Sequence, residues 1–256
     1  MKKKLLFFII LCLPISSYTM LIQLIQQTKK LFRRNVYTNQ TPVTQLCSYI
    51  INQKPPQQKI LNSISTVKKN KNLSGTDLNT LYFLTRVMTF DKKEYNSVNP
   101  KNDFLLHNIT RQNNDALLNI ALMYGLNTII DAPNKDNNSP LYIAATNAYT
   151  SLVNIFINTR ATINLQNEYG RTALLGATLS LLNSNFSHDI NAFFNIIMLL
   201  IEAGANPFIT DSHRKIADYY ICNALKNLEN KRERTIHNEQ GDLIYLYQSM
   251  RQLLKE

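Results

Sequence analysis

A short motif that repeats at a fixed distance constrains this chain more than any other feature of its sequence. The stretch SPLYIAA (139–145) has a capping Ser139, a proline, an apolar run and two alanines. The stretch RTALLGA (171–177) has the same pattern, with Thr172 at the cap, 33 residues after Ser139. A hydroxyl cap satisfies free amides at a helix start, and proline suits the first helical position because no N–H donor is needed there. Each stretch therefore predicts the start of a short helix, and its small residues predict close packing against a neighbouring helix.

The motif lies within a longer repeating unit. FLLHNI (104–109) fits the pattern upstream, and KIADYY (215–220) fits it more weakly downstream. The first three copies are each followed by an apolar run at helical spacing, namely Leu117–Leu122, Leu152–Ile157 and Ile196–Ile201. A period near 33 residues with two helices per unit is typical of a solenoid, in which stacked units share one continuous core.

These units resemble the ankyrin repeat. SPLYIAA looks like that family's TPLHxAA signature, LLIEAGANPF (199–208) looks like its second helix and turn, and NEYGRTALLGA (167–177) looks like its hairpin and next first helix. The resemblance covers roughly residues 100–220 and implies an all-α fold. That fold is an ankyrin-repeat solenoid of about four degenerate helix-turn-helix units with hairpin loops and helical caps at both ends. In this family the histidine at the position of His107 helps to hold the turn.

The sequence departs from the family pattern at two kinds of position. Arg160 stands where glycine is preferred, at a helix end that usually turns left-handed. Asn137, and either His213 or Arg214, stand where the hairpin usually has glycine. The repeats are therefore expected to be degenerate.

In the ankyrin family, partners contact variable positions on the hairpin tips and first helices, and the resemblance implies the same here. The corresponding residues are Lys135, Asp136, Asn138, Thr146 and Asn147 in one unit, Glu168, Tyr169 and Arg171 in the next, and Asp211, Ser212 and Arg214 in the last. Tyr169 and Arg171 are the expected anchors, because Tyr and Arg dominate interface hot spots. Replacing both with alanine is predicted to weaken binding without lowering the melting temperature. The extra residues 180–191 are a second candidate surface.

The first residues have the parts of an export signal. Lys2–Lys4 precede an apolar core at Leu5–Leu13, and small residues precede a cut after Thr19. The alternative is an uncleaved membrane anchor over residues 5–25, because the apolar stretch approaches the length needed to span a bilayer. Residues 20–34 repeat apolar residues at helical spacing and carry basic side chains, so they could lie on a membrane surface or pack as an amphipathic helix.

Four regions follow from these patterns: a signal peptide (1–19), an N-terminal region (20–98), an ankyrin-repeat domain (99–220) and C-terminal capping helices (221–256). The N-terminal region has helical patterns at 43–51, 60–67 and 73–88, which could be a helical cap or further degenerate repeats. The C-terminal region has a loop or solvated helix at 226–240 and an amphipathic closing helix at 241–256.

No motif in the sequence indicates a catalytic, cofactor-binding or metal site. The histidines are isolated, and there is no nucleophile elbow, phosphate-binding glycine loop or HExxH motif. Cys47 and Cys222 are flanked by apolar residues and are expected to be buried, either as free thiols or as one disulfide. We therefore expect a protein that is not an enzyme and needs no cofactor.

The formal net charge is +11, but the basic residues are scattered and no aromatic-interleaved basic stripe occurs. This distribution argues against nucleic acid as the partner. The expected function is binding of another protein by an exported, periplasmic or secreted ankyrin-repeat protein. Two alternatives remain: a membrane-associated structural or scaffold protein held by an uncleaved anchor, and a host-directed effector of an intracellular bacterium, since the leader and the Asn, Ile and Lys bias look bacterial.

Overall fold

The computed structural model describes residues 41–70, 72–90, 105–183 and 190–232, together with the single positions 248 and 252. The chain divides into two compact units, residues 1–45 and 46–256, and only residues 41–45 of the first are described. Within these ranges the chain forms helices and loops and no strand. The expected all-α class is therefore confirmed.

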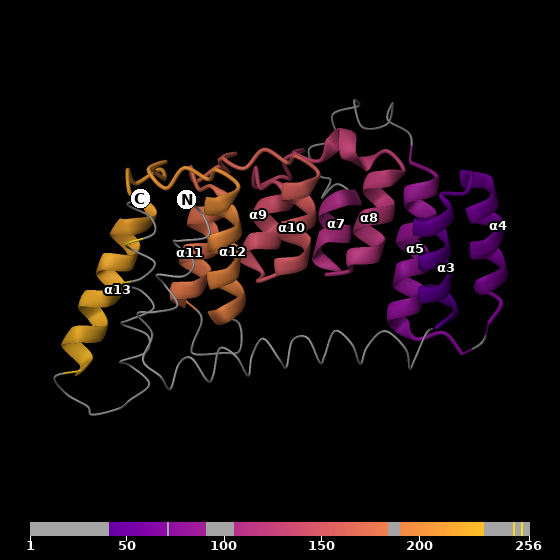
Figure 1. The fold of residues 1–256 in the computed structure, drawn as a ribbon, viewed down its shortest axis with the longest axis horizontal. Helices are drawn as coiled ribbons and strands as arrows, with labels where there is room; N and C mark the ends of the chain where they lie inside the picture. The colour runs from indigo at the N-terminus through magenta and orange to yellow at the C-terminus, as the bar shows by residue number, and fades with distance from the viewer. Residues whose placement is uncertain are drawn as a thin grey trace, which may run out of the picture. The chain divides into compact units, whose positions relative to one another are not determined.

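The described helices from residue 105 onward come in pairs. The pairs are α7 (Leu105–Arg111) with α8 (Asp115–Met123), α9 (Pro140–Thr146) with α10 (Thr150–Asn158), and α11 (Ala173–Asn183) with α12 (Ile190–Glu202), followed by α13 (Ala217–Arg232). A short 3-10 helix, η1 (Leu126–Ile129), follows α8. Figure 1 shows these pairs side by side, from magenta to yellow, in the order of the sequence.

The pairs stack in two rows. The first helices contact one another in series, α7 with α9, α9 with α11 and α11 with α13. The second helices do the same, α8 with α10 and α10 with α12. Each helix start predicted from the repeated motif, and each second apolar run, therefore occupies a corresponding place in the stack.

The predicted helix starts are capped by the predicted side chains. Ser139 Oγ accepts from the Tyr142 backbone N–H at 3.1 Å, and Pro140 is the first residue of α9. Thr172 Oγ1 accepts from the Leu175 backbone N–H at 3.3 Å at the start of α11. A cap of this kind stabilises a helix by about 1 kcal/mol, which matters for helices as short as α9.

The small residues lie where first helices meet. Ala144 and Ala145 of α9 have no exposed surface. A Cβ added to Gly176 of α11 would lie 2.6 Å from Tyr142 Cε2 and 2.8 Å from Thr146 Cγ2. The absence of a side chain at residue 176 therefore lets α11 approach α9, as the sequence predicted.

The second helices end in the predicted left-handed turn, even where glycine is missing. Arg160 has φ 66° and Gly204 has φ 91°. At both ends the backbone N–H of the next residue donates to the carbonyl five residues earlier: Ala161 to Phe156 at 3.0 Å, and Ala205 to Leu200 at 2.8 Å. This is the Schellman arrangement, and it forces Arg160 into a conformation that costs about 1–2 kcal/mol for a residue with a Cβ.

The core runs between the two rows of helices and consists of aliphatic side chains and one large aromatic ring. Its fully buried members include Leu106, Leu117, Leu141, Leu152, Phe156, Leu174, Ile196 and Leu200. Each pair contributes to this core and continues it into the next pair, so no pair buries its apolar face alone.

The three helices predicted upstream are present as α3 (Pro42–Gln53), α4 (Gln57–Val67) and α5 (Gly75–Met88). α5 packs on α4 and also on α7 and α8. Ser74 begins α5 with a capping box, accepting from the Asp77 backbone while Asp77 accepts from the Ser74 backbone. α5 runs for 14 residues without the break that divides the later pairs, so this region departs from the two-helix unit.

Downstream, residues 226–232 continue α13, so the first part of the predicted loop or solvated helix is helical. Several expected features lie outside the described residues: the leader and anchor (1–19 and 5–25), the 20–34 segment, the 241–256 helix as a whole, and residues 184–189 of the 180–191 insertion. Cys47 and Cys222 are free. Cys47 is buried as expected, whereas the expectation for Cys222 was wrong because it lies half-buried near the end of the described core.

Candidate interaction surface

Each hairpin between consecutive helix pairs is tied together by one buried side chain. In the middle hairpin, Asn167 Oδ1 accepts from the backbone N–H groups of Tyr169 and Arg171, both at 3.0 Å. The Asn167 backbone N–H also donates to the Arg171 carbonyl at 3.0 Å, which closes the loop. Asn167 therefore satisfies backbone donors that would otherwise be left unpaired at the tip.

The neighbouring hairpins use the same bonds. Asn134 Oδ1 accepts from Asp136 and Asn138 at 3.0 and 2.9 Å. Asp211 Oδ1 accepts from His213 and Lys215 at 2.9 and 3.0 Å. Asn134, Asn167 and Asp211 are 7%, 7% and 5% exposed, so all three anchors are buried.

One residue in each hairpin has a left-handed backbone. These residues are Asn137 with φ 57°, Gly170 with φ 70° and Arg214 with φ 58°. Arg214 rather than His213 is therefore the residue that stands in the place of glycine in the last hairpin.

Adjacent hairpins are bonded to each other. Ser212 N donates to the Tyr169 carbonyl at 2.8 Å, and Glu168 N makes the equivalent, longer contact of 3.5 Å with the Asp136 carbonyl. Asn167 Nδ2 donates to Asn138 Oδ1 at 2.8 Å. The three loops thus form one continuous surface of linked tips.

The contact between the last two hairpins leaves no space for a side chain at residue 170. A Cβ on Gly170 would lie 3.0 Å from Ser212 N and 3.1 Å from the Asp211 carbonyl carbon. Glycine is needed at this position for two reasons, its positive φ and this close approach of the next backbone.

The predicted partner-binding residues divide by exposure. Exposed are Lys135, Asn147, Glu168, Tyr169, Ser212 and Arg214; half-buried are Asp136, Asn138, Thr146 and Arg171; buried is Asp211. The exposed tip residues come from all three hairpins, so the structure brings them to one side of the stack. Asn147 instead follows α9 and donates to the Ile143 carbonyl at 2.8 Å.

Asp211 was expected to contact a partner, and its position does not fit that role. Its Oδ1 holds two backbone amides, and its Oδ2 accepts from the Tyr220 hydroxyl. Burial is the largest single influence on the pKa of the Asp211 carboxyl and raises it, but these hydrogen bonds together keep the pKa below its usual value. Asp211 is therefore a structural residue of its hairpin.

Asn138 and Thr146 also have bonds within the fold. The Asn138 carbonyl accepts from His107 Nε2 at 3.0 Å, and Thr146 Oγ1 donates to the Tyr142 carbonyl at 3.0 Å. His107 is fully buried and joins α7 to the first hairpin, which agrees with its expected role of holding the turn.

Tyr169 and Arg171, the expected anchors, differ in accessibility. Tyr169 is 51% exposed, and the Arg171 guanidinium carbon lies 5.4 Å from its ring centroid. Arg171 is half-buried, and its guanidinium faces the Tyr142 hydroxyl. The double alanine replacement would therefore remove contacts within the fold as well as part of the candidate surface, and the single Tyr169 replacement is the cleaner test.

The three hairpin anchors are the important residues that sequence reasoning missed. Asn134, Asn167 and Asp211 each lie five residues before the residue that precedes a first helix: Ser139, Thr172 and Ile216. The recurrence of Asn or Asp at this offset was a usable signal. It was hidden because asparagine is frequent throughout the chain.

An open polar cavity of about 550 Å³ was also not anticipated. It lies where α5 faces the α7–α8 turn and the start of α10, and it is lined by Thr76, Thr80, Gln112, Asn113, Asn114, Asp115, Ala116 and Ser151. Burial is the largest influence on the pKa of Asp115 and raises it, while a hydrogen bond with Ser151 opposes this. The side chains that line the cavity come from α5, from the α7–α8 turn with the start of α8, and from α10, and only the fold brings them together.

Within the described ranges, no three His, Cys, Asp or Glu side chains gather closely enough to hold a metal ion. Across the same ranges, no helix combines the length and apolarity that a membrane span requires. No protein-family model matches the sequence, and no curated protein matches it significantly.

Proposed function

We propose that this chain is an ankyrin-repeat protein that binds another protein through its linked hairpin tips and first-helix face, without catalysis. The observation that carries the proposal is the threefold recurrence of one hairpin, with a buried Asn or Asp anchor, a left-handed fourth residue and a backbone bond to the next tip. This recurrence, together with two rows of paired helices, supports the ankyrin interpretation of the repeated motif.

The chemistry of the tips favours a protein partner. Lys135, Glu168, Tyr169 and Arg214 offer both charges and one aromatic ring on a backbone held by buried anchors. A rigid surface loses little conformational entropy on binding, which favours affinity. Mixed charge is also the reason to prefer a protein to a nucleic acid, which would require a predominantly basic face.

We further propose that the protein is exported, on the strength of the leader at residues 1–19. In that setting the repeat domain would meet its partner outside the cytoplasm. A membrane-held scaffold is the competing outcome, and the mature N-terminal mass separates the two because only a cleaved chain begins after Thr19.

A crosslinking pull-down tests the function. The full chain is the bait, offered to lysate of the producing cell and, in parallel, to lysate of any cell it lives in or on. Tyr169→Ala is the test variant, and Tyr82→Ala on α5 is the matched control because Tyr82 is similarly exposed, at 57% against 51%. We expect one dominant partner that Tyr169→Ala loses by at least tenfold, about 1.4 kcal/mol, and that Tyr82→Ala retains.

Equal capture by both variants would contradict the assignment of the tips as the binding surface. Recovery of the bait in membranes with no enriched protein would instead favour the membrane-held scaffold.

A further inference from the structure

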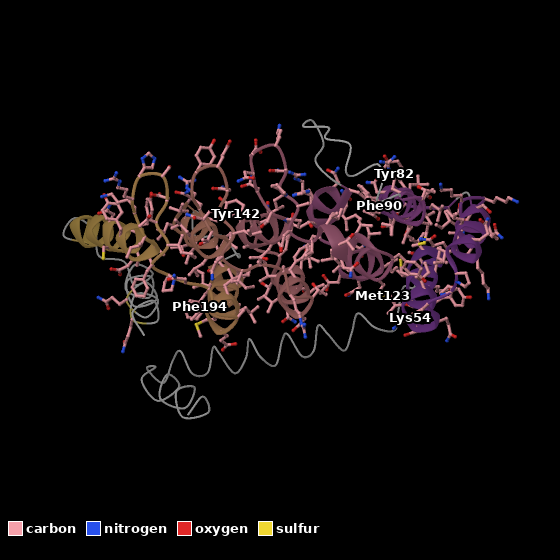
Figure 2. The ribbon with its side chains drawn as sticks, turned by 90° about the horizontal axis from the view of Figure 1, so that it is seen from above. Lys54, Tyr82, Phe90, Met123, Tyr142 and Phe194 are labelled. Atoms are coloured by element: carbon pink, nitrogen blue, oxygen red, sulfur yellow. The ribbon has the colours of Figure 1, made fainter. Side chains whose placement is uncertain are left out.

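The Arg171 side chain lies close to three parts of the fold: its own hairpin tip, α9 and α13. Its guanidinium is adjacent to the Tyr169 ring at the hairpin tip and faces the Tyr142 hydroxyl of α9. Burial raises the pKa of Tyr220 on α13, and the positive charge of Arg171 partly opposes this. In Figure 2, Tyr142 is labelled on the side of the stack from which the hairpin loops project, whereas Met123 and Phe194 lie on the opposite side.

The Tyr142 ring is held in place by the packing of its helix. It lies against the α11 backbone at Gly176, where a Cβ would come within 2.6 Å of Tyr142 Cε2 and 3.0 Å of Cζ. A side chain at 176 would displace the ring. The glycine therefore sets the position of the hydroxyl in front of Arg171.

Among the described residues, the Tyr142 O–H group has no acceptor. Burial raises the pKa of the Tyr142 hydroxyl above its usual value, and the neighbouring Arg171 guanidinium and Asn167 carboxamide oppose this as hydrogen-bond partners. Arginine and the NH₂ of asparagine can only donate, so the Tyr142 oxygen is the acceptor toward both of them. The O–H proton is left to donate to a further acceptor.

Arg171 also lacks an anionic partner among the described residues. It makes no ion pair there, and its Nε is buried without a hydrogen-bond acceptor. Asp211, the buried carboxylate of the next hairpin, is already occupied by two backbone amides and Tyr220. A half-buried cation that has no anionic partner and one unpaired N–H group is costly, and an added carboxylate would offset that cost.

We propose that Arg171 and the Tyr142 hydroxyl form a carboxylate-binding site on the first-helix face, which takes an Asp or Glu side chain of the partner protein. This inference rests on the proposed function and names the chemistry of the partner residue. One arginine and one hydroxyl match a single negative charge. A phosphate dianion is disfavoured because Glu168 and Asp136 place negative charge close by, at Tyr169.

The test follows the Arg171 side chain by NMR in the isotope-labelled full chain. The probes are acetate, N-acetylglutamate amide and its uncharged analogue N-acetylglutamine amide, with chloride used to hold the ionic strength constant. We expect the Arg171 Nε–H signal to shift saturably with the two carboxylates, in the millimolar range, and not with the glutamine analogue. Arg214 is the matched control, because it is an exposed arginine of the next hairpin and is expected to show only the general salt effect.

Two variants sharpen the result. Tyr142→Phe keeps the ring against Gly176 and removes only the hydroxyl, so carboxylate binding should weaken about fivefold. Asn154→Ala changes an exposed residue of α10, in the other row of helices, and should leave binding unchanged. A Tyr142→Phe chain that folds normally and binds the probes as tightly as the unmodified chain would overturn the proposal.

Equal responses of Arg171 and Arg214, or tighter binding of inorganic phosphate than of acetate, would also overturn it. Tighter binding of N-acetylglycine, which carries a main-chain carboxylate, would overturn the assignment to a side chain. If the pull-down finds a partner that acetate does not compete with and Tyr142→Phe does not lose, the site fails while the function stands. If Arg171 binds carboxylates but no partner is captured, the function fails while the site stands.

Discussion

The middle and last hairpins have the same backbone but different chemistry. The middle one is anchored by a neutral carboxamide, Asn167, and turns at Gly170. The last is anchored by a carboxylate, Asp211, and turns at Arg214. The comparison shows that the repeat conserves a set of hydrogen bonds rather than a set of residues, because Asn and Asp both present an acceptor oxygen at the same place.

The difference has physical consequences. The carboxylate also accepts from Tyr220 and so connects the last hairpin to α13, but it makes that connection dependent on pH. Gly170 permits the close approach of the next hairpin, whereas Arg214 adopts the same left-handed backbone at a cost in strain. The middle hairpin is therefore expected to be the most sensitive to substitution.

The largest effect is expected from Asn167→Ala. It leaves the Tyr169 and Arg171 backbone amides without their acceptor and removes the bond to Asn138, so the free energy of unfolding should fall by about 3 kcal/mol. Chemical denaturation of the full chain measures it. Glu168→Ala, at the exposed neighbouring position, serves as the control and should change stability by less than about 0.5 kcal/mol. Equal effects of the two substitutions would contradict the role of Asn167.

Gly170→Ala comes next. The positive φ costs about 1–2 kcal/mol with a Cβ, and the contact with Ser212 N adds to it, so we expect a loss of about 2 kcal/mol. Asn137→Gly provides the opposite case, because residue 137 has the same backbone and should tolerate glycine with little change. A harmless Gly170→Ala would mean that the last two hairpins are further apart than described.

Asp211→Asn converts the last anchor into the form found in the middle hairpin. The bonds to the backbone amides should persist, but the Tyr220 hydroxyl no longer faces a charged acceptor. The free energy of unfolding near neutral pH should therefore fall by about 1 kcal/mol. Because the folded-state pKa of Asp211 lies below its usual 3.8, its contribution is fully present above that value. The contribution is lost as the pH falls through the lower, folded-state pKa. The free energy of unfolding, measured from neutral to acid pH, should therefore depend less on pH in the variant than in the unmodified chain. An unchanged pH profile would contradict the assignment.

The smallest effect is a gain. Arg160→Gly and Arg214→Gly each relieve a left-handed strain of about 1–2 kcal/mol against an entropy cost of about 0.5–1 kcal/mol, so each should stabilise by about 0.5 kcal/mol. Melting temperatures of the two variants, compared with that of Arg111→Gly in a right-handed helix, provide the measurement. We expect Arg111→Gly to lower the melting temperature. A lower melting temperature in all three variants would show that the arginine side-chain contacts outweigh the backbone strain.

Much of the fold could be predicted because its signals are local and repeated. Ser139 and Thr172 cap helices by contacts with residues three positions on, and Gly204 ends a helix by its own backbone freedom. The anchors were harder to predict, since Asn134 and Asn167 are common residues whose burial depends on the hairpin closing around them. The exposure of the candidate binding residues was predicted in part: Tyr169 and Arg214 are exposed, whereas Asp211 is buried because Tyr220, from the next helix, covers its second oxygen.

The central claim is that each hairpin is held by its own buried anchor and so presents a rigid tip. Hydrogen exchange of the full chain tests it most directly, at the backbone amides of Tyr169, Arg171, His213 and Lys215. We expect these amides to be protected like those of the adjoining helices. We expect Asn167→Ala to remove the protection at Tyr169 and Arg171 and to leave His213 and Lys215 protected. Exchange of all four at the rate of an open loop in the unmodified chain would contradict it.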